Sequence, residues 1–338
     1  MQKNQPVALW LFICCGMIFV MALLGAITRL TESGLSITDW ALVTGVFPPL
    51  NKHQWQQAFG AYQHIPQYQL FHRDMTLSEF KTIYFWEWLH RLWGRLSGLT
   101  LMAPFICFWA RGKISKTLGL KLLGIFALFA LQGFIGWYMV ESGLSARTSV
   151  SPYRLALHLG FALLIYSLIL WAALDLVGAR RTPVLWCLRR HGWVSLGFLT
   201  VTIMWGAFTA GLRAGEAYNT WPLMEGEFFP AAALTIIPKW HNVFENLALV
   251  QFIHRWLAPI TALIILAWAY RLWDSVPEKI NRQWALALGG MAMVQVALGL
   301  STLLTHAEIV IAVLHQAGAI ALLTLLLINL QRLKPHAG

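Results

Sequence analysis

The sequence is poor in charged residues, which make up 12% of its 338 positions. Soluble globular proteins carry about 25%, and here hydrophobic residues fill the difference, at 58% of the chain. Apolar stretches of about 20 residues recur along the sequence, and each is long enough to cross a bilayer as a helix. The composition therefore excludes an ordinary soluble domain and predicts a polytopic membrane protein.

Alternation of polar and apolar residues is missing from these stretches, which excludes a transmembrane β-barrel. We therefore expect an all-α fold. Eight spans are predicted, with boundaries good to about three residues. They are 7–27, 86–109, 117–140, 153–174, 193–212, 246–270, 284–304 and 310–330.

Cysteine is scarce as well. Cys14 and Cys15 fall in the first span, Cys107 in the second, and Cys187 in a loop expected to be cytoplasmic. No cysteine pair lies in an outward-facing loop, so we predict no structural disulfide and inert thiols. The first apolar stretch shows neither a clear cleavage site nor an Arg- and Ser-rich leader before it. We expect a retained span, which favours a bacterial inner membrane.

Acidic residues are outnumbered, 14 against 25 Lys and Arg, and the net charge is +11. The basic residues gather in alternate loops, which argues against nucleic acid as a partner. By the positive-inside rule this pattern places both termini in the cytoplasm. The basic groups lie at 111–116, 180–190, 271–282 and 332–334.

Four histidines fall inside apolar spans, where a titratable side chain is costly. They form two matched pairs: His90 in EWLHRLWGR with His254 in QFIHRWLAP, and His158 in LALHLGFALL with His315 in AVLHQAGAIALL. Each lies about four to eight residues inside the outer end of its span, roughly 6–12 Å deep. A shared depth is expected of paired ligands, whereas unrelated packing histidines have no reason to share one.

Other segments repeat with the histidines. GAITRLTESGLSITDW (25–40) matches GAFTAGLRAGEAYNTWP (206–222), and LQGFIG (131–136) matches VQVALG (294–299). We predict two four-helix bundles, 1–175 with the first histidine pair and 192–338 with the second. Four helices separate equivalent points, so the halves have parallel topology and a pseudo-two-fold axis along the membrane normal.

Two histidines on facing helices can bind a haem iron from both sides. Zinc prefers three or four converging ligands, often with thiolates, which neither half offers. Arg91 and Arg255 directly follow a histidine. Each is a candidate partner for a haem propionate, with snorkelling to the headgroups as the equal alternative.

The halves differ at one position. Glu87 lies three residues before His90, on the same helix face, whereas Gln251 precedes His254. Only the first site therefore has a carboxylate, which can accept a proton or stabilise a developing cation. We expect a reacting substrate in the first half and a permanent electron-transfer haem in the second.

The first outer loop, 28–83, is long and carries three further histidines, whose role the sequence leaves open. We expect this loop to cap the first site, with a short amphipathic helix near 53–62, and the loop 213–245 to cap the second site or dock a partner. The three histidines are His53, His64 and His72.

Long segments in both halves, in order, make the chain resemble the haem A synthase family, in the form shared by proteobacteria and mitochondria. These segments are TRLTESGLSITDW, EFKTIYFWEWLHRLWGR, YRLALHLG, YNTWPLMEG, NVFENLALVQFIHR and VLHQAG. The resemblance runs from about residue 16 to 330 and implies eight helices in two bundles. It also implies oxidation of the C8 methyl of haem O, through hydroxylated intermediates, to the formyl of haem A for cytochrome c oxidase.

By the same resemblance, His254 and His315 are the axial ligands of haem b. His90 and His158 would flank haem O, with haem A as product, and Glu87 would be the catalytic carboxylate. The implied partners are the haem O synthase prenyltransferase, an unidentified electron-transfer protein, the oxidase assembly machinery and membrane lipid. Homo-oligomerisation stays open.

Two alternatives remain. The first is a b-type electron carrier with two permanent haems, which explains the four histidines but not the difference between Glu87 and Gln251. The second is a transporter or haem-handling protein, since repeated bundles are common in transporters. Neither the electron partner nor the source of the formyl oxygen, water or dioxygen, follows from the sequence.

Overall fold

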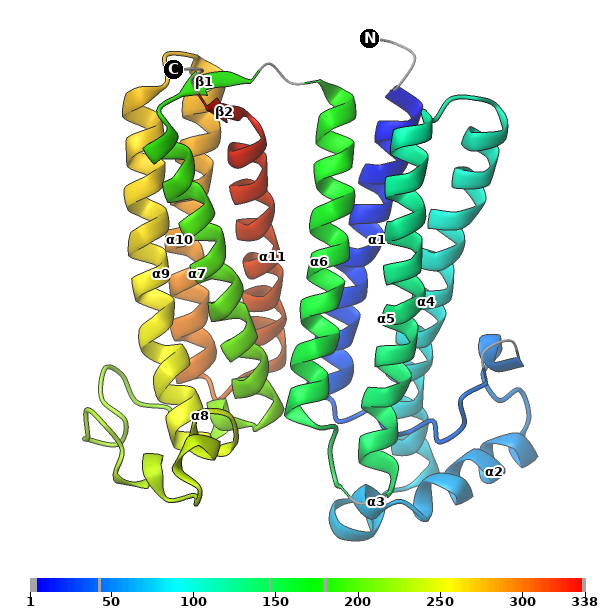
Figure 1. Cartoon of the computed structure of the whole chain (residues 1–338). Coiled ribbons are helices and arrows are strands. Elements are labelled where there is room, and N and C mark those ends of the chain that lie inside the picture. Colours follow the sequence, from blue (N-terminus) through cyan, green and yellow to red (C-terminus); the bar gives the residue numbers. More distant parts are fainter. Residues whose placement is uncertain (1–4, 42–43, 146, 179–180, 336–338) are drawn as a thin grey trace. The chain divides into compact units, whose positions relative to one another are not determined.

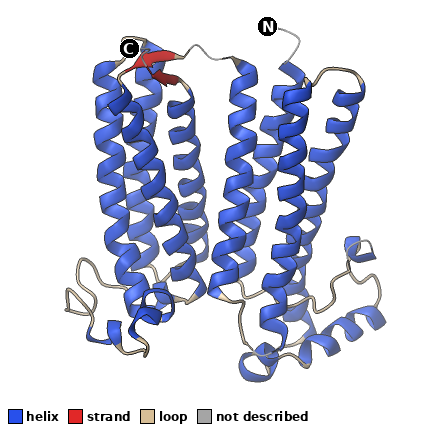
Figure 2. Cartoon of the chain, in the orientation of Figure 1, coloured by secondary structure: helices blue, strands red, loops and turns tan. Residues whose placement is uncertain are grey.

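The computed structural model describes residues 5–41, 44–145, 147–178 and 181–335, and almost all of its regular structure is helical (Figure 2). Eight of the described helices have 23 residues or more. They are α1 (Gln5–Leu30), α4 (Leu77–Ala110), α5 (Lys116–Ser145), α6 (Pro152–Val177), α7 (Trp186–Gly211), α9 (Leu247–Ser275), α10 (Lys279–Leu304) and α11 (Ile309–Gln331).

Seven of the described long helices are long and apolar enough to cross a membrane, which confirms an all-α membrane protein. The exception is α4, whose 34 residues include Glu87, Arg91 and Arg95. Each of the eight predicted spans falls on one long helix, and most helices extend past the prediction at both ends. Capping explains the early start of α4, because Thr76 and Glu79 form a reciprocal capping box there.

The connections carry the shorter elements. They are α2 (Lys52–Gln63), α3 (Pro66–Phe71), α8 (Asn242–Glu245) and the 3-10 turns η2 (Thr44–Val46), η3 (Ala214–Glu216), η4 (Ala231–Leu234) and η5 (Lys239–His241). Helix α2 confirms the short helix expected near 53–62. Helix α7 begins at Trp186 rather than at residue 193, so Cys187 lies in its first turn and not in a loop. All four cysteines are free, Cys107 and Cys187 exposed and Cys14 and Cys15 buried.

The chain divides into two compact units. Residues 13–166 form what we call the N-terminal unit; the residues up to 12 and those from 167 onward form the C-terminal unit. Each is described by itself. The expected bundles 1–175 and 192–338 stay a prediction, because the boundaries between the observed units fall within α1 and within α6 and not in a loop.

Four helices close a ring of contacts in the N-terminal unit. Trp93 on α4 donates to the Met17 carbonyl on α1 at 2.9 Å. The thiol of Cys15 on α1 reaches the Tyr166 carbonyl on α6. The facing surfaces of α4 and α5, and of α5 and α6, include glycines that contact side chains of the next helix. Neighbouring helices therefore approach closely, as expected in a membrane, where packing and hydrogen bonds hold helices together.

The C-terminal unit has its own ring, α7–α9–α10–α11 (Figure 1). Three of its helices approach closely at Gly192 on α7, where a Cβ would lie 2.4 Å from Trp268 of α9 and 2.6 Å from Leu330 of α11. Trp268 also donates to the Leu188 carbonyl at 2.9 Å. A side chain larger than hydrogen at residue 192 would force these helices apart.

A short parallel sheet was not expected from the sequence. Strand β1 (Thr182–Val184) pairs with β2 (Leu333–Pro335), and Thr182 N–H donates to the Arg332 carbonyl at 2.8 Å. Asn281 at the start of α10 donates to the Thr182 hydroxyl at 2.7 Å. Three-residue strands leave no periodicity to read, and their partner lies 150 residues away, so only the folded chain reveals them.

Helices α2 and α3 pack over the end of the N-terminal unit where α4 begins (Figure 1). Their apolar core joins the end of α1 to the start of α4 through Leu35, Tyr62, Ile65, Phe80 and Ile83. Gln67 donates to the Glu32 carbonyl at 3.1 Å and adds a polar tie. The long first loop is thus a packed cap.

Candidate functional site

The four intramembrane histidines divide between the two units. His90 on α4 and His158 on α6 belong to the N-terminal unit; His254 on α9 and His315 on α11 belong to the C-terminal unit. Each pair therefore comes from two non-consecutive helices of the same unit, α4 with α6 and α9 with α11, as the sequence predicted.

Each imidazole packs against a glycine of a neighbouring helix. A Cβ added at any of these glycines would lie 2.9–3.1 Å from the facing Cε1, closer than real Cβ atoms normally approach. A side chain at any of these four positions would therefore require the imidazole to shift. The pairs are Gly25 with His90, Gly136 with His158, Gly206 with His254 and Gly299 with His315.

A glutamine contacts the second histidine of each pair. Gln132 on α5 donates to the His158 carbonyl at 2.9 Å, and its Nε2 lies 3.1 Å from His158 Nδ1. Gln295 on α10 does the same for His315, at 3.0 Å and 3.2 Å. One amide therefore contacts both the backbone and the ring of each histidine.

Glu87 is buried and fully hydrogen-bonded. Its Oε2 accepts from the Ser36 hydroxyl and the Ile37 N–H, both at 2.8 Å. Its Oε1 accepts from Nε and Nη2 of Arg91 at 3.1 Å and 2.6 Å. The carboxylate thus joins α4 to the segment that follows α1. It also forms an ion pair with Arg91, one helical turn further along α4.

Gln251 occupies the matching place in the C-terminal unit, but it donates hydrogen bonds where Glu87 accepts them. Its Nε2 donates to the carbonyls of Ala214 and Tyr218, both at 2.9 Å. In the aligned repeats Tyr218 stands where Ile37 stands in the first half. Both side chains therefore fasten the loop after the first helix of their unit, Glu87 as acceptor and Gln251 as donor.

The two arginines fasten the same loops. Arg91 donates to the carbonyls of Asp39 and Ile37 at 2.9 Å and 2.8 Å, in addition to Glu87. Arg255 donates to the carbonyls of Tyr218 and Leu223 at 3.0 Å and 2.9 Å. Each guanidinium also lies over a tryptophan of its loop, Trp40 or Trp221. Neither points into open solvent, so snorkelling does not describe them.

The histidines of the first loop have separate environments. His72 bonds to the Tyr62 hydroxyl at 2.6 Å and lies 3.4 Å from the Glu32 carboxylate. Burial lowers the pKa of His72. His64 contacts the Gly60 carbonyl and His53 is exposed. Among the described residues, no group of three or more His, Cys, Asp or Glu could hold a metal ion.

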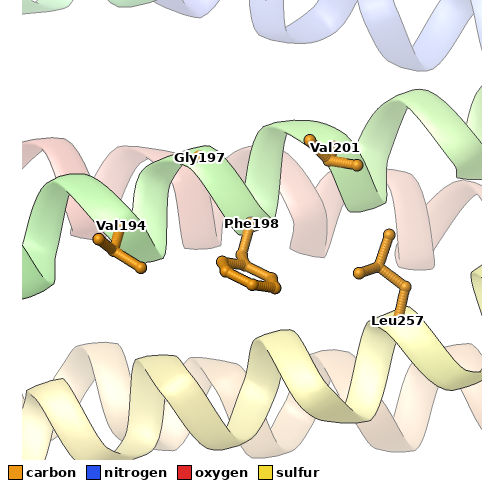
Figure 3. Close-up of a pocket in the computed structure, with 5 residues that line it drawn as sticks. All are labelled: Val194, Gly197, Phe198, Val201 and Leu257. Carbon is orange, nitrogen blue, oxygen red and sulfur yellow. The ribbon is translucent and has the colours of Figure 1, made fainter.

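An apolar hollow of about 330 Å³ lies between α7 and α9, lined by Val194, Gly197, Phe198, Val201 and Leu257 (Figure 3). No titratable or nucleophilic side chain lines it. The hollow is lined by apolar side chains and a glycine and offers no catalytic group.

Comparison with known proteins identifies the family of this chain. Residues 8–327 match the model of the family described as cytochrome oxidase assembly protein. The chain belongs to this family. A relative from Rhodospirillum centenum, named Heme A synthase, is 53% identical over 98% of this chain and 89% of its own length. Two more with that name are from a Bradyrhizobium species, 46% identical over 99% and 93%, and Nitrosomonas eutropha, 42% identical over 96% and 92%.

A haem bound to this chain would need ligands for its iron and hydrogen-bond donors for its propionates. Bis-imidazole ligation needs two histidines from different helices, and each unit has such a pair within its apolar helices. Haem also carries propionates, which need N–H donors. Four buried Trp or Arg N–H groups of the C-terminal unit have no hydrogen-bond partner in the described chain: Arg189 Nε, Trp205 Nε1, Arg255 Nε and Trp256 Nε1. The last three lie within two residues of His254 or Gly206 along the sequence and are the candidate donors to a propionate.

The four glycines and two glutamines were not singled out from the sequence as site residues. A signal for them was present, because the repeated segments LQGFIG and VQVALG carry Gln and Gly at the same two places. The GAIT and GAFT segments likewise each begin at the glycine that faces a histidine. The repeat was used to predict the order of the helices. Only the structure shows that the repeated glycines and glutamines contact the paired histidines.

Proposed function

We propose that this protein is a haem A synthase. It oxidises the C8 methyl group of haem O to a formyl group, through hydroxylated intermediates, and supplies haem A for cytochrome c oxidase. The carrying observation is a family match over residues 8–327 in a chain that places each histidine pair on two non-consecutive helices of one unit.

We assign the substrate to the N-terminal unit, with His90 and His158 as the residues that hold haem O. The support is Glu87, the one carboxylate within a helical turn of a paired histidine in the described chain. A carboxylate can accept a proton from an attacking water or stabilise positive charge at the methyl carbon.

For Glu87 to act in this way, one of its hydrogen bonds to Ser36, Ile37 or Arg91 must be exchanged for one to substrate or water. The Ser36 hydroxyl is the group that gives way at least cost, because it can turn to another acceptor while the Ile37 N–H and the Arg91 guanidinium cannot. Ser36 already lies 3.4 Å from such an acceptor, the Ile83 carbonyl. This arrangement lets Oε2 take a proton while Oε1 stays paired with Arg91.

We assign haem b to the C-terminal unit, with His254 and His315 as its axial ligands. The buried N–H donors of Trp205, Arg255 and Trp256 support this assignment, because a permanently held haem needs its propionates bound. When bound, haem b supplies one-electron transfer. Arg91 is bonded to Glu87 and its loop, so of the two candidate propionate partners Arg255 has the N–H to spare.

For the membrane arrangement we propose eight spans. Seven are the apolar helices, and the eighth is α4, which carries more charged residues than the others. The bundles are 1–175 and 192–338, related by a pseudo-two-fold axis along the membrane normal. Both termini lie in the cytoplasm of a bacterium, the protein resides in the inner membrane, and the histidines lie near the outer face. Haem O synthase delivers the substrate, and a further protein exchanges electrons with haem b.

A membrane preparation that makes haem O, with and without this protein, tests the proposal by chromatography with mass detection of extracted haems. Haem A or its hydroxymethyl precursor, formed only with the protein, is the expected result. Unchanged haem O beside extra haem b on the purified protein would instead establish the di-haem carrier, which the matching glycine and glutamine contacts of the two units favour.

A further inference from the structure

Two glutamines hold one histidine of each pair from a neighbouring helix. We infer that Gln132 and Gln295 are positioning residues: they set the ring orientation of His158 and His315 and the hydrogen bond at Nδ1. Through that bond Gln295 tunes the reduction potential of haem b. This inference rests on the proposed function, since it concerns the haem ligands.

The geometry leaves each ring little freedom. Gln295 and Gly299 are four residues apart and share one face of α10. The amide of Gln295 lies 3.2 Å from His315 Nδ1, and a Cβ at Gly299 would lie 2.9 Å from His315 Cε1. The His315 ring therefore lies between Gly299, which leaves room for it, and Gln295, which contacts its Nδ1. Gln132 and Gly136 on α5 repeat the arrangement against His158.

The unpartnered atoms of these amides point to a ligand-bound role. Oε1 of Gln132 and of Gln295 is buried and has no hydrogen-bond partner among the described residues. A neutral imidazole that binds iron through Nε2 carries its proton on Nδ1 and needs an acceptor there. A rotation of the amide that exchanges Nε2 for Oε1 supplies that acceptor and gives up the hydrogen bond to the backbone carbonyl of the histidine. An acceptor for Nδ1–H is thus available beside each of these two histidines.

In the C-terminal unit, Gly318 leaves the space that the Gln295 side-chain amide occupies. A Cβ added at Gly318, three residues after His315 on α11, would lie 2.2 Å from Gln295 Oε1. The residue three after His158 is Phe161. Gly318→Ala therefore displaces the Gln295 amide without removing it and gives a second, independent way to disturb the same contact.

The bond has an electronic consequence. An acceptor on Nδ1–H makes the imidazole a stronger donor to iron, which favours the oxidised state and lowers the reduction potential. Removing the acceptor raises the potential. For one hydrogen bond, we expect the ratio of reduced to oxidised haem at a fixed applied potential to rise about two- to twelvefold.

The test is a redox titration of haem b in the purified full-length protein, with low-temperature electron paramagnetic resonance of the ferric state. Gln295→Met should raise the midpoint potential and change the resonance, and Gly318→Ala should change both in the same sense. Gln132→Met is the matched control: it should leave the haem b signals as in the wild type and alter haem O binding instead. Wild-type potential and resonance in Gln295→Met would overturn the inference.

If Gln295→Met fails to retain haem b, Gln295→Glu decides, because it keeps the shape and the acceptor. Haem b retained at a potential below wild type supports the inference, and haem b lost again or held at the wild-type potential overturns it. A wild-type protein purified without any haem b would count against the proposed function itself, whereas haem b unresponsive to all these variants would sink only the positioning role.

Discussion

Glu87 and Gln251 occupy equivalent places before a paired histidine and fasten equivalent loops with opposite polarity. Glu87 accepts hydrogen bonds from Ser36 and Ile37, and Gln251 donates to the carbonyls of Ala214 and Tyr218. The structural task of the position is thus shared by the two units, while the carboxylate is confined to one. Exchange of the two residue types therefore disturbs the loop anchor in both units but removes a carboxylate only from the first.

Glu87→Gln should lower formation of haem A or its hydroxymethyl precursor by about 10²–10⁴-fold, the usual contribution of a general acid–base group. The substituted amide keeps the shape but cannot accept a proton. Haem quantification per mole of purified protein measures this, and haem b should remain at the wild-type level. Gln251→Glu is the matched control for a disturbed loop anchor, because its carboxylate cannot donate to the Ala214 and Tyr218 carbonyls, and it should lower turnover far less. Full turnover in Glu87→Gln would remove the catalytic role and leave that of a loop anchor.

Gly299→Ala should reduce the haem b content, because the added Cβ would press against His315 Cε1 at 2.9 Å. Gly136→Ala should spare haem b and reduce conversion of haem O, since it presses on His158. Absorbance spectra and extracted haems distinguish the two effects. The controls are Gly290→Ala on α10 and Gly133→Ala on α5, where a Cβ meets nothing within 4 Å. Equal effects at the control positions would attribute the loss to helix stability.

Acid should loosen the cap formed by α2 and α3. Burial lowers the pKa of His72 in the folded protein below its ordinary value of 6.5, despite the Glu32 carboxylate 3.4 Å away. The released segment then binds a proton more tightly than the docked one. Docking is therefore favoured above pH 6.5, and this contribution is lost as the pH falls below that value.

Hydrogen exchange of residues 52–72 between pH 7.5 and pH 5, a range of about one unit or more on either side of the ordinary histidine pKa, measures the release. His72→Gln keeps a hydrogen-bonding side chain beside Tyr62 but does not titrate, so its exchange should not show the additional acid-dependent increase. A cap that opens equally with pH in both proteins would show that another group controls it.

Asn246→Ala should destabilise the C-terminal unit by about 1–3 kcal/mol. The buried side chain caps α9 by accepting from the N–H groups of Ala248 and Leu249 and donates to the Ala232 carbonyl at 2.7 Å. Asn246→Asp keeps the cap but loses the donor, so its stability should fall between wild type and alanine. Thermal unfolding in detergent gives the order, and a wild-type midpoint for Asn246→Ala would contradict the prediction.

Much of the fold could be predicted because it is set by local composition. Long apolar runs without alternation specify helices regardless of what lies around them, and each predicted span falls on one long helix. The paired histidines were visible because a costly residue repeated at matching places in both halves. The start of α4 at Leu77 was missed, since an apolar window does not register a capped first turn that lies outside the apolar run.

The sequence by itself thus determined the class of protein, the helices and the positions of the four paired histidines within them, all of which follow from hydropathy and from repetition along the chain. The tertiary structure decided what touches them. Glu87 meets Ile37 across 50 residues, Gly136 and Gln132 enclose His158, and β1 meets β2 across 150. Such contacts depend on which faces of the helices pack together and how closely. Hydrogen-bond geometry and steric fit decide this, and neither leaves a periodic trace in the sequence.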